Sequence, residues 1–255
     1  MTDDPFLTVA IGDDHVATIE LCRPPTNFFS LGLIGGIADA LEQLDADPAC
    51  RAAVLCAQGK HFCAGADFSG AGSASYTTEE LYAAAVRIFR TETPVVAAVQ
   101  GAAIGGGLGL ALSADFRVAA PEARFSANFA RLGFHQGFGL SVTLPRLVGE
   151  QHAAELLFTG RRIKGDEAVE IGLADRLAAL DELRSVAHDF ARQIAISAPL
   201  AVQSIRTTLR GDLADRVEAA TAHEAAEQER LRATADFAEG TRAMAERRQP
   251  DFRGE

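Results

Sequence analysis

Two glycine-rich segments carry the residue types best suited to chemistry in this sequence. The first runs from Gly59 to Phe68 (GKHFCAGADF) and the second from Gly101 to Leu110 (GAAIGGGLGL). Neither has the spacing of a phosphate-binding loop, because no Ser or Thr follows Gly59-Lys60 and no GxGxxG pattern fits the triple glycine. Both segments instead offer backbone N–H groups that bulky side chains do not cover.

A helix that begins at the triple glycine would direct unpaired N–H groups and a partial positive charge outward. A second N–H from the region of Ala66 would converge with that of Gly106 if the two segments are neighbours. Two donors aimed at one oxygen form an oxyanion hole, in which each donor lowers a reaction barrier by about 3 kcal/mol. Taken singly, each segment is also compatible with a tight turn or a close packing contact.

The elements that position these segments follow from the apolar pattern. Alternating apolar residues predict a hairpin, and helical spacing begins after Ser30, a suitable N-cap. The expected strands are 7–11, 16–21, 52–57, 95–99 and 116–119, and the expected helices are 31–44, 79–89 and 105–113. This order indicates an α/β protein built from repeated ββα units on largely buried sheets.

Strand signals stop after about Asp181, and the remaining chain is rich in Ala, Arg and Glu. Helices are expected over 182–196, 200–210, 213–232 and 236–247. The composition changes at Ser197-Ala198-Pro199, so we expect a core over 1–197 and a helical domain over 198–255. Because such charged helices bury little surface alone, the second domain is expected to pack on the core or on a neighbouring subunit.

The charge balance excludes several classes of partner. The chain has 35 Asp and Glu against 24 Lys and Arg, a formal net charge of −11. This excess argues against nucleic acid or an anionic membrane as the main partner. The stretch from Pro94 to Leu112 carries no charge, but its glycines and alanines favour a buried strand, turn and helix over a membrane span.

Cysteine and histidine patterns point to no metal centre. Cys22, Cys50, Cys56 and Cys63 match no zinc or redox spacing, and the six histidines form no HxxxH or HExxH pair. The acidic start Met1-Thr2-Asp3-Asp4 is unlike a signal peptide. We therefore expect reduced thiols in a cytoplasmic protein.

Taken together, the segments resemble the crotonase, or enoyl-CoA hydratase/isomerase, superfamily over almost the whole chain. The matching stretches are Leu21–Asn27, Phe62–Asp67, Gly101–Gly107, Leu157–Ile163 and Glu246–Phe252. The resemblance implies a ββα spiral core with a C-terminal helical domain. It also implies a homotrimer or a dimer of trimers that acts on acyl-CoA, with coenzyme A as part of the substrate and no permanently bound cofactor.

The resemblance also implies roles for individual residues. The thioester carbonyl would lie between the N–H groups of Ala66 and Gly106, where an enolate is stabilised. The segment from Leu21 to Asn27 would wrap the CoA adenine, and Arg23 and Lys60 are candidates for its phosphates, although both types are common as surface charges. The substrate-binding residues implied are Arg23, Pro25, Thr26, Lys60, Ala64, Asp67, Phe68, Ile104, Phe129, Leu132 and Phe252.

The sequence departs from the family at its acid and base. Hydratases of the family carry two glutamates, and the matching positions here are Gly109 and Phe129. The usual addition of water therefore lacks its acid and base, and an isomerase that keeps only the second glutamate is not expected either. An aspartate at about Gly137, which a halide-displacing relative needs, is also absent.

His135 and Gln136 are the nearest polar candidates in what remains. His135 has a side chain that titrates near neutral pH, so it is a candidate acid or base, or else a structural group beside a glycine turn. Gln136 would orient a water or a substrate group. Tyr76 and Tyr82 are expected as exposed flap residues, with the acyl pocket within reach.

Three functions stay open at this point. The first is an enoyl-CoA hydratase/isomerase-like enzyme with non-standard catalytic residues. The second is decarboxylation or C–C cleavage in the same oxyanion hole, and the third is acyl-CoA binding without catalysis.

Overall fold

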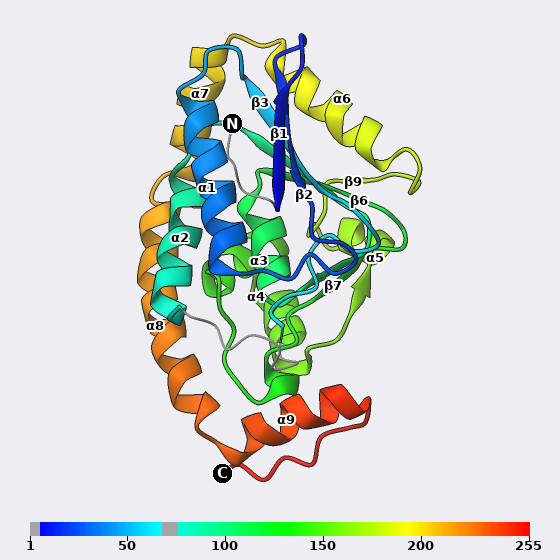
Figure 1. The fold of residues 1–255 in the computed structure, drawn as a ribbon, viewed down its shortest axis with the longest axis vertical. Helices are drawn as coiled ribbons and strands as arrows, with labels where there is room; N and C mark the ends of the chain where they lie inside the picture. Colours follow the sequence, from blue (N-terminus) through cyan, green and yellow to red (C-terminus); the bar gives the residue numbers. More distant parts are fainter. Residues whose placement is uncertain (1–5, 68–75) are drawn as a thin grey trace.

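The computed structural model describes residues 6–67 and 76–255 (Figure 1). Within them, one sheet has six strands in the order β1-β2-β3-β4-β6-β9, and a second has three in the order β5-β7-β8. The strands are β1 (Leu7–Ile11), β2 (Val16–Leu21), β3 (Ala52–Ala57), β4 (Val95–Val99), β5 (Ala102–Ile104), β6 (Phe116–Ala119), β7 (Arg124–Ser126), β8 (Ile163–Lys164) and β9 (Arg176–Leu177).

The helices lie on both faces of the six-stranded sheet and beyond its end. They are α1 (Leu31–Asp45), α2 (Thr78–Arg90), α3 (Gly106–Ser113), the 3-10 turn η1 (Ala130–Leu132), α4 (Leu140–Thr159), α5 (Gly165–Glu170), α6 (Leu183–Ala195), α7 (Pro199–Arg210), α8 (Leu213–Arg232) and α9 (Ala235–Glu246). No helix in the described part of the chain is long and apolar enough to cross a membrane.

The large sheet is buried on both faces at its centre. β1 and β2 form an antiparallel hairpin, and β2, β3, β4, β6 and β9 run parallel. Every residue of β3 and β4 is buried, as expected for parallel strands covered on both sides. One face packs in a cluster with α1, α2 and α3, and the other packs on the alanines of α6. The sheet thus holds α3 rigidly within the core.

The predicted α/β class and most predicted elements are confirmed. The five predicted strands occur with the predicted bounds, and Ser30 caps α1 by accepting a hydrogen bond from the N–H of Leu33. The strand pairs β4–β5 and β6–β7 each precede a helix, in agreement with ββα units. The sequence patterns did not predict β5, β7, β8, β9, η1, α4 or α5.

The missed elements share a physical cause. The four missed strands have three residues or fewer, which is too short for an alternation to show. In α4, Pro145 and the left-handed Gly149 (φ 77°) interrupt the helical pattern.

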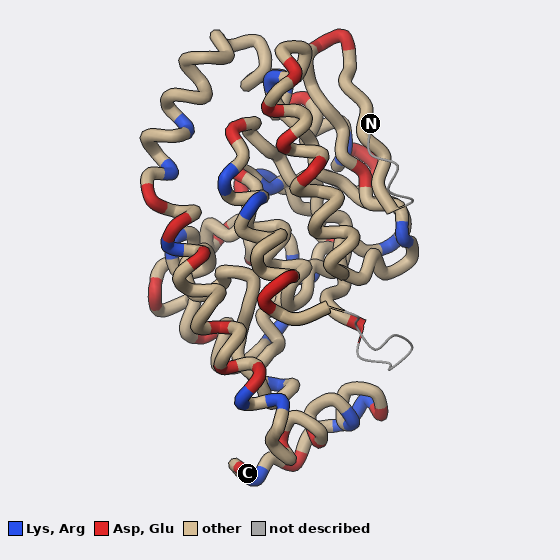
Figure 2. Tube along the Cα trace, turned by 60° about the vertical axis from the view of Figure 1, so that its left-hand side comes forward, with Lys and Arg blue, Asp and Glu red and all other residues tan. Residues whose placement is uncertain are grey.

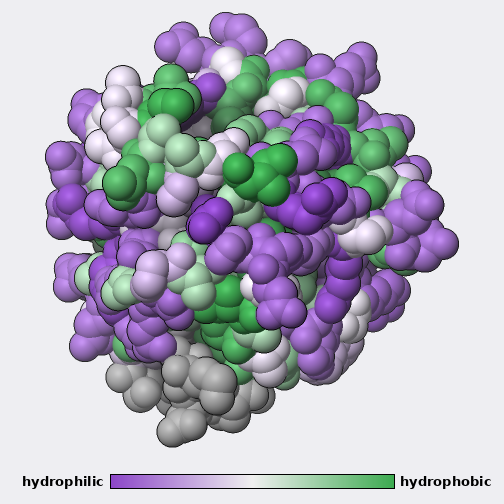
Figure 3. All heavy atoms as spheres, turned by 90° about the horizontal axis from the view of Figure 1, so that it is seen from above, coloured by the Kyte–Doolittle hydropathy of each residue, from purple (hydrophilic) through white to green (hydrophobic). Residues whose placement is uncertain are grey.

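The C-terminal helices contact the core to different extents. α8 packs along α2 and α4, and α9 packs on η1. In Figure 1, α8 runs beside α2 at the left and leads to α9 at the bottom. Acidic and basic positions are intermixed along these helices (Figure 2). By contrast α7 has no buried residue, and Leu200, Ile205 and Leu209 on it are 79%, 59% and 70% exposed. Apolar side chains show at this end of the molecule between polar ones (Figure 3).

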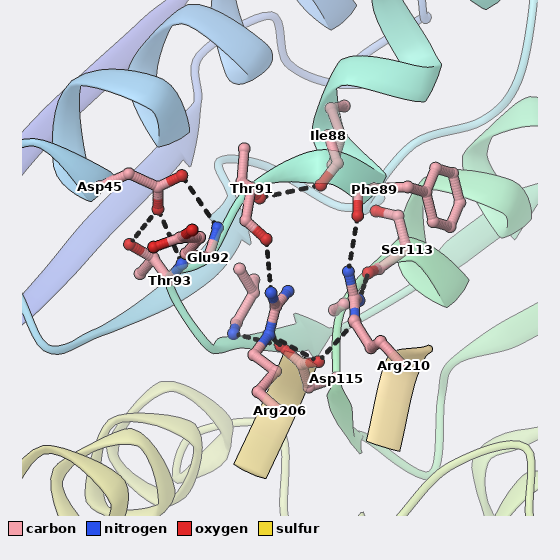
Figure 4. A network of polar contacts seen from close by, with 12 residues as sticks. Asp45, Ile88, Phe89, Thr91, Glu92, Thr93, Ser113, Asp115, Arg206 and Arg210 are labelled. Carbon is pink, nitrogen blue, oxygen red and sulfur yellow. Dashed lines mark hydrogen bonds and ion pairs between the residues drawn. The ribbon is translucent and has the colours of Figure 1, made fainter. Parts of the chain in front are cut away.

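Two arginines attach α7 to the core. Arg206 and Arg210 both donate to the carboxylate of Asp115, over 2.9–3.0 Å (Figure 4). Arg206 also donates to the carbonyl of Thr91, and Arg210 donates to the carbonyls at the ends of α2 and α3. Burial lowers the pKa of Arg210 to about 10, although the charge of Asp115 opposes that shift. A cavity of about 360 Å³ lies beside this network, away from the glycine segments.

Candidate active site

The two glycine-rich segments lie side by side, as the oxyanion-hole hypothesis requires. Cys63 and Ala103 form a parallel bridge, and the N–H of Ile104 donates to the carbonyl of Cys63 over 3.1 Å. A Cβ atom on Gly107 would overlap that same carbonyl, so the approach depends on glycine at this position. Cys63 is fully buried, and this burial raises the pKa of its thiol to about 12.

The first donor of the candidate hole is at the start of α3. Gly105 precedes the helix with φ 56°, a conformation that favours glycine, and its N–H donates to the carbonyl of Ser126 over 2.9 Å. Gly106 is the first helical residue, so its N–H has no acceptor inside the helix. This N–H lies at the positive end of the helix dipole.

The second donor segment is fixed against the first. Gly65 has φ 85°, and a Cβ atom there would lie 2.8 Å from the carbonyl oxygen of Ile104. The carbonyl of Gly65 accepts from the N–H of Phe29 over 3.1 Å. Ala66 follows directly and is half-buried. The structure therefore brings the segments of Ala66 and Gly106 into contact through Gly65 and Ile104.

Asn27 joins the two loops proposed to hold coenzyme A. It is fully buried, accepts from the N–H of Arg23 over 2.9 Å, and donates to the carbonyls of Gln58 and His61 over 2.8 and 2.7 Å. Its φ of 47° lies in the left-handed region, which asparagine tolerates better than most residues. These bonds place the loop of Arg23 beside the loop of Lys60.

The other residues predicted for this end lie on the same two loops. Pro25 is exposed and Thr26 is half-buried, and the carbonyl of Thr26 accepts from the N–H of Ala64 over 2.9 Å. Lys60 is exposed, whereas the guanidinium of Arg23 lies 4.3 Å above the ring of Phe6. Five predicted substrate-binding residues thus form one connected region: Arg23, Pro25, Thr26, Lys60 and Ala64.

His61 stands between this region and the second glycine segment. Its Nδ1 accepts from the N–H of Ala102 over 3.2 Å, which places the proton of the neutral ring on Nε2. Partial burial lowers the pKa of His61 below its ordinary value, and the charges of Lys60 and Arg124 add to the shift. His61 is therefore neutral near pH 7 and acts as a hydrogen-bond acceptor for the loop.

Aromatic rings cover the start of α3. A Cβ atom on Gly106 would lie 2.7–3.0 Å from ring atoms of Phe29, and one on Gly105 would lie 3.6 Å from the ring of Phe129. A Cβ atom on Gly109 would lie 2.6–2.8 Å from Phe138. The reacting end of the candidate site is therefore apolar, and Phe138 takes the space that a side chain at position 109 would need.

His135 and Gln136 contact the C-terminal helices. The His135 ring packs edge-on against the ring of His223 on α8, with centroids 5.7 Å apart, and its Nδ1 is 2.9 Å from the carbonyl of Gln136. The amide of Gln136 donates to the hydroxyl of Ser141 on α4 over 3.0 Å. The described contacts of these two side chains are thus with α4, α8 and their own loop.

Tyr82 differs from its prediction as an exposed flap residue. It is 6% exposed, because α2 turns it into the core, where its hydroxyl packs against the backbone of Gly137. Burial raises the pKa of Tyr82 well above its ordinary value. Tyr76 is half-buried and packs against the core.

The remaining predicted site residues are dispersed. Ile104 is half-buried and Asp67 is exposed beside the hole, while Phe68 lies outside the described residues. Leu132 is buried under α9, against Gly240. Phe252 is 40% exposed on the tail.

Several residues of the site were not predicted from the sequence. They are Phe29, Phe138 and Asn128, whose side-chain oxygen would lie 3.5 Å from a Cβ atom on Gly105. The only signal for them in the sequence is indirect: each glycine that tolerates no Cβ atom implies a neighbour that occupies the space.

The chain is similar to known proteins over its whole length. Residues 12–255 match the family model described as enoyl-CoA hydratase/isomerase. A crotonyl-CoA hydratase from Syntrophomonas wolfei is 34% identical, with 94% of this chain and 95% of that protein covered. A carnitinyl-CoA dehydratase from Salmonella paratyphi A is 32% identical, with 94% and 95% covered.

The fold agrees with a solved structure of the same kind. The crystal structure of an enoyl-CoA hydratase/isomerase from Pseudoalteromonas atlantica superposes with a TM-score of 0.86 at 32% identity, and covers 97% of this chain and 100% of that chain. Together with the paired glycine segments, these similarities show that the chain belongs to the enoyl-CoA hydratase/isomerase (crotonase) superfamily.

Proposed function

We propose that this protein acts on an acyl-CoA thioester by stabilising its enolate, without a pair of carboxylates that activate water. The thioester oxygen is bound by the N–H groups of Ala66 and Gly106, and the coenzyme A lies along the loops of Arg23 and Lys60. The similarity to a crotonyl-CoA hydratase and a carnitinyl-CoA dehydratase supports the substrate class. Coenzyme A enters as part of the substrate, so the reaction needs no permanently bound cofactor.

The packing at positions 109 and 129 supports the proposal that the protein does not add water to its substrate. Phe138 stands against Gly109, the position matched to the first family glutamate, so a carboxylate there has no space. The position matched to the second glutamate is Phe129, which is 7% exposed and packs its ring 5.4 Å from that of Phe134. Neither position supplies an acid or a base to the reacting carbons.

The aromatic surroundings favour decarboxylation as the reaction. An apolar pocket raises the energy of a localised carboxylate more than that of the delocalised transition state. The bond between Cα and the carboxylate breaks, carbon dioxide leaves, and the electron pair passes into the enolate held by the two N–H groups. A proton from water then reaches Cα. C–C cleavage of a β-keto acyl-CoA would use the same hole: water adds to the β-carbonyl, the Cα–Cβ bond breaks, the β-acyl fragment leaves as a carboxylic acid, and the electron pair passes into the same enolate.

A substrate screen with product analysis tests this proposal. Purified protein is incubated with crotonyl-CoA, a malonyl-type acyl-CoA and a β-keto acyl-CoA, and we expect turnover of the second or third and none of the first. Fast hydration of crotonyl-CoA would contradict the proposal. Binding of acyl-CoA in calorimetry without any product would favour the non-catalytic alternative. Loss of turnover in His135→Ala would support His135 as the group that passes the proton from water to Cα, with Gln136 orienting that water.

We also propose that the protein forms a homotrimer or dimer of trimers in the cytoplasm, with residues 198–255 as the oligomerisation domain. The exposed apolar side chains of α7 support this arrangement, because contiguous apolar surface commonly marks an interface. No nucleic acid or membrane partner is proposed, in keeping with the net charge of −11.

A further inference from the structure

The loop from His135 to Gly139 connects the C-terminal helices to the reacting end of the site. Phe138 in this loop is 1% exposed and has φ 62°, which is unusual for a bulky residue. Such a conformation persists only where the surroundings impose it. Other residues must therefore hold Phe138 in this conformation.

The ring of Phe138 packs over α3 beside the candidate site. It lies against Gly109, and its centroid is 6.0 Å from that of Phe29 in an edge-to-face contact. Phe29 in turn lies on Gly106, whose N–H is the candidate oxyanion donor. A shift of Phe138 would thus change the space next to the acyl carbons without touching the loops proposed for coenzyme A.

A buried carboxylate holds one end of the loop. Glu224 on α8 is 0% exposed and accepts hydrogen bonds from the N–H groups of Gly139, over 2.8 Å, and Ser141, over 3.0 Å. These N–H groups lie at the start of α4, where the helix dipole also favours a negative charge. Both carboxylate oxygens are used, so an amide at this position would turn a donor toward one of the two N–H groups.

Two further side chains hold the rest of the loop. Gln228, one turn further along α8 and 2% exposed, donates to the carbonyl of His135 over 2.9 Å. The hydroxyl of Tyr82 lies beside the side-chain amide of Gln228, since both would contact a Cβ atom on Gly137. It also packs so closely on Gly137 that a Cβ atom there would overlap it. The loop and the start of α4 are therefore held at four backbone positions: His135, Gly137, Gly139 and Ser141.

We propose that Glu224 is a positioning residue that, with Tyr82 and Gln228, fixes Phe138 as the wall that limits the size of the acyl group. This inference rests on the proposed function, because it concerns the acyl end of the same site. These three side chains, Tyr82, Glu224 and Gln228, form a clamp on Phe138. The clamp determines which acyl-CoA thioesters fit, and it favours short acyl groups over long or bulky ones. A change in the clamp is expected to alter the selection between acyl groups and to leave the affinity for coenzyme A itself unchanged.

Calorimetry with acetyl-CoA and octanoyl-CoA tests the selection. In Phe138→Ala, the ratio of the two Kd values should shift toward octanoyl-CoA by about tenfold, an effect typical of added space in a hydrophobic pocket. Glu224→Gln should shift the ratio in the same direction by a smaller factor, and Glu229→Gln, an exposed charge on the same helix, should leave it unchanged. Free coenzyme A should bind all variants equally. A general loss of folded protein lowers both signals together and leaves the ratio constant.

Hydrogen exchange supplies a second measurement that needs no ligand. Peptides covering 135–142 should exchange faster in Glu224→Gln than in Glu229→Gln, and equal exchange would overturn the clamp. If Glu224→Gln does not fold, Tyr82→Phe removes a single hydroxyl and is expected to act in the same direction. Acyl-CoA binding with an unchanged Kd ratio overturns this inference alone. Failure of the wild-type protein to bind any acyl-CoA overturns the proposed function as well.

Discussion

Phe138 limits position 109 to a hydrogen atom. α3 is entirely buried, and its glycines face Phe29, Cys63 and Phe138 at distances that leave no room for a Cβ atom. In an ordinary helix, alanine is more favourable than glycine by about 1 kcal/mol. In α3, glycine should be more favourable than alanine, because the available space, and not the helix propensity, limits the size of the side chain.

Gly109→Ala is therefore expected to destabilise the protein by about 1–3 kcal/mol, the usual effect of overpacking. Urea denaturation measures the change, and a double cycle with Phe138→Ala should show a coupling energy, because the second change vacates the space. Gly35→Ala in α1, where no atom lies within 4 Å, is the matched control and should stabilise the protein slightly. Equal stabilisation by both alanines would contradict the steric explanation.

His61 gives the stability a pH dependence. Its pKa in the folded state is below the ordinary value of 6.5, so the unfolded chain takes up the proton first as the pH falls. The stabilisation is complete above about pH 6.5 and is lost as the pH falls through the folded pKa. His61→Asn keeps an acceptor for the N–H of Ala102 but does not titrate.

We expect the free energy of unfolding to fall more steeply between pH 7.5 and 5 in the wild-type protein than in His61→Asn. Denaturation curves at several pH values give both slopes. The carboxylates contribute equally to the two proteins and cancel in the difference. Identical slopes would show that His61 keeps its ordinary pKa in the folded state.

At the scale of elements, α7 depends on charge rather than on apolar burial for its attachment. Its two arginines converge on Asp115 with side chains only 10% and 13% exposed, and Asp115 also accepts from the N–H of Val95. Removing one partner of a buried ion pair leaves the other charges uncompensated, which costs more than the pair contributes. This network therefore holds α7, the first helix of residues 198–255, in place on the core.

Asp115→Asn is expected to destabilise the protein by about 3–5 kcal/mol and to release α7. Limited proteolysis between Ile196 and Gly211 should become faster, and denaturation should report the loss. Asp39→Asn, at a partner of Arg87 that is 52% exposed, should cost less than about 1 kcal/mol. A similar loss in both variants would mean that burial of the network has no special effect.

At the scale of the whole molecule, α7 presents apolar side chains to solvent. Leu209 is 70% exposed and Ile205 is 59% exposed, although both border the cavity beside Asp115. A monomer gains nothing from this exposure, whereas a second copy packed on α7 would bury these residues and stabilise the assembly at about 25 cal/mol per Å² of apolar surface.

Leu209→Glu is expected to convert the proposed oligomer into smaller species, because the interface would have to bury an unpaired carboxylate. Sedimentation velocity of the full chain measures the mass, and Glu122→Lys, in the exposed turn before β7, is the control. A wild-type protein that sediments as a monomer, or a Leu209→Glu variant that keeps the wild-type mass, would refute the α7 interface.

Local patterns were sufficient for most of the fold but for only part of the site. Ser30 and the buried strands act through neighbours in the sequence, so their roles were predictable. Phe29, Glu224 and Gln228 act across long separations in the chain and leave no local pattern. Tyr82 was predicted as an exposed flap residue because its position relative to the polar loop suggested exposure, whereas its helix faces the core.

Residue types and local patterns were enough to predict the order of the longer elements, the two glycine-rich segments and the absence of carboxylates at positions 109 and 129. These properties depend on residue identity and on short-range geometry. Tertiary packing was needed to show what fills the space above α3: Phe29, Phe129 and Phe138, the last held from α2 and α8. That outcome depends on close packing between distant segments, where a contact of a few ångströms is set by the whole fold.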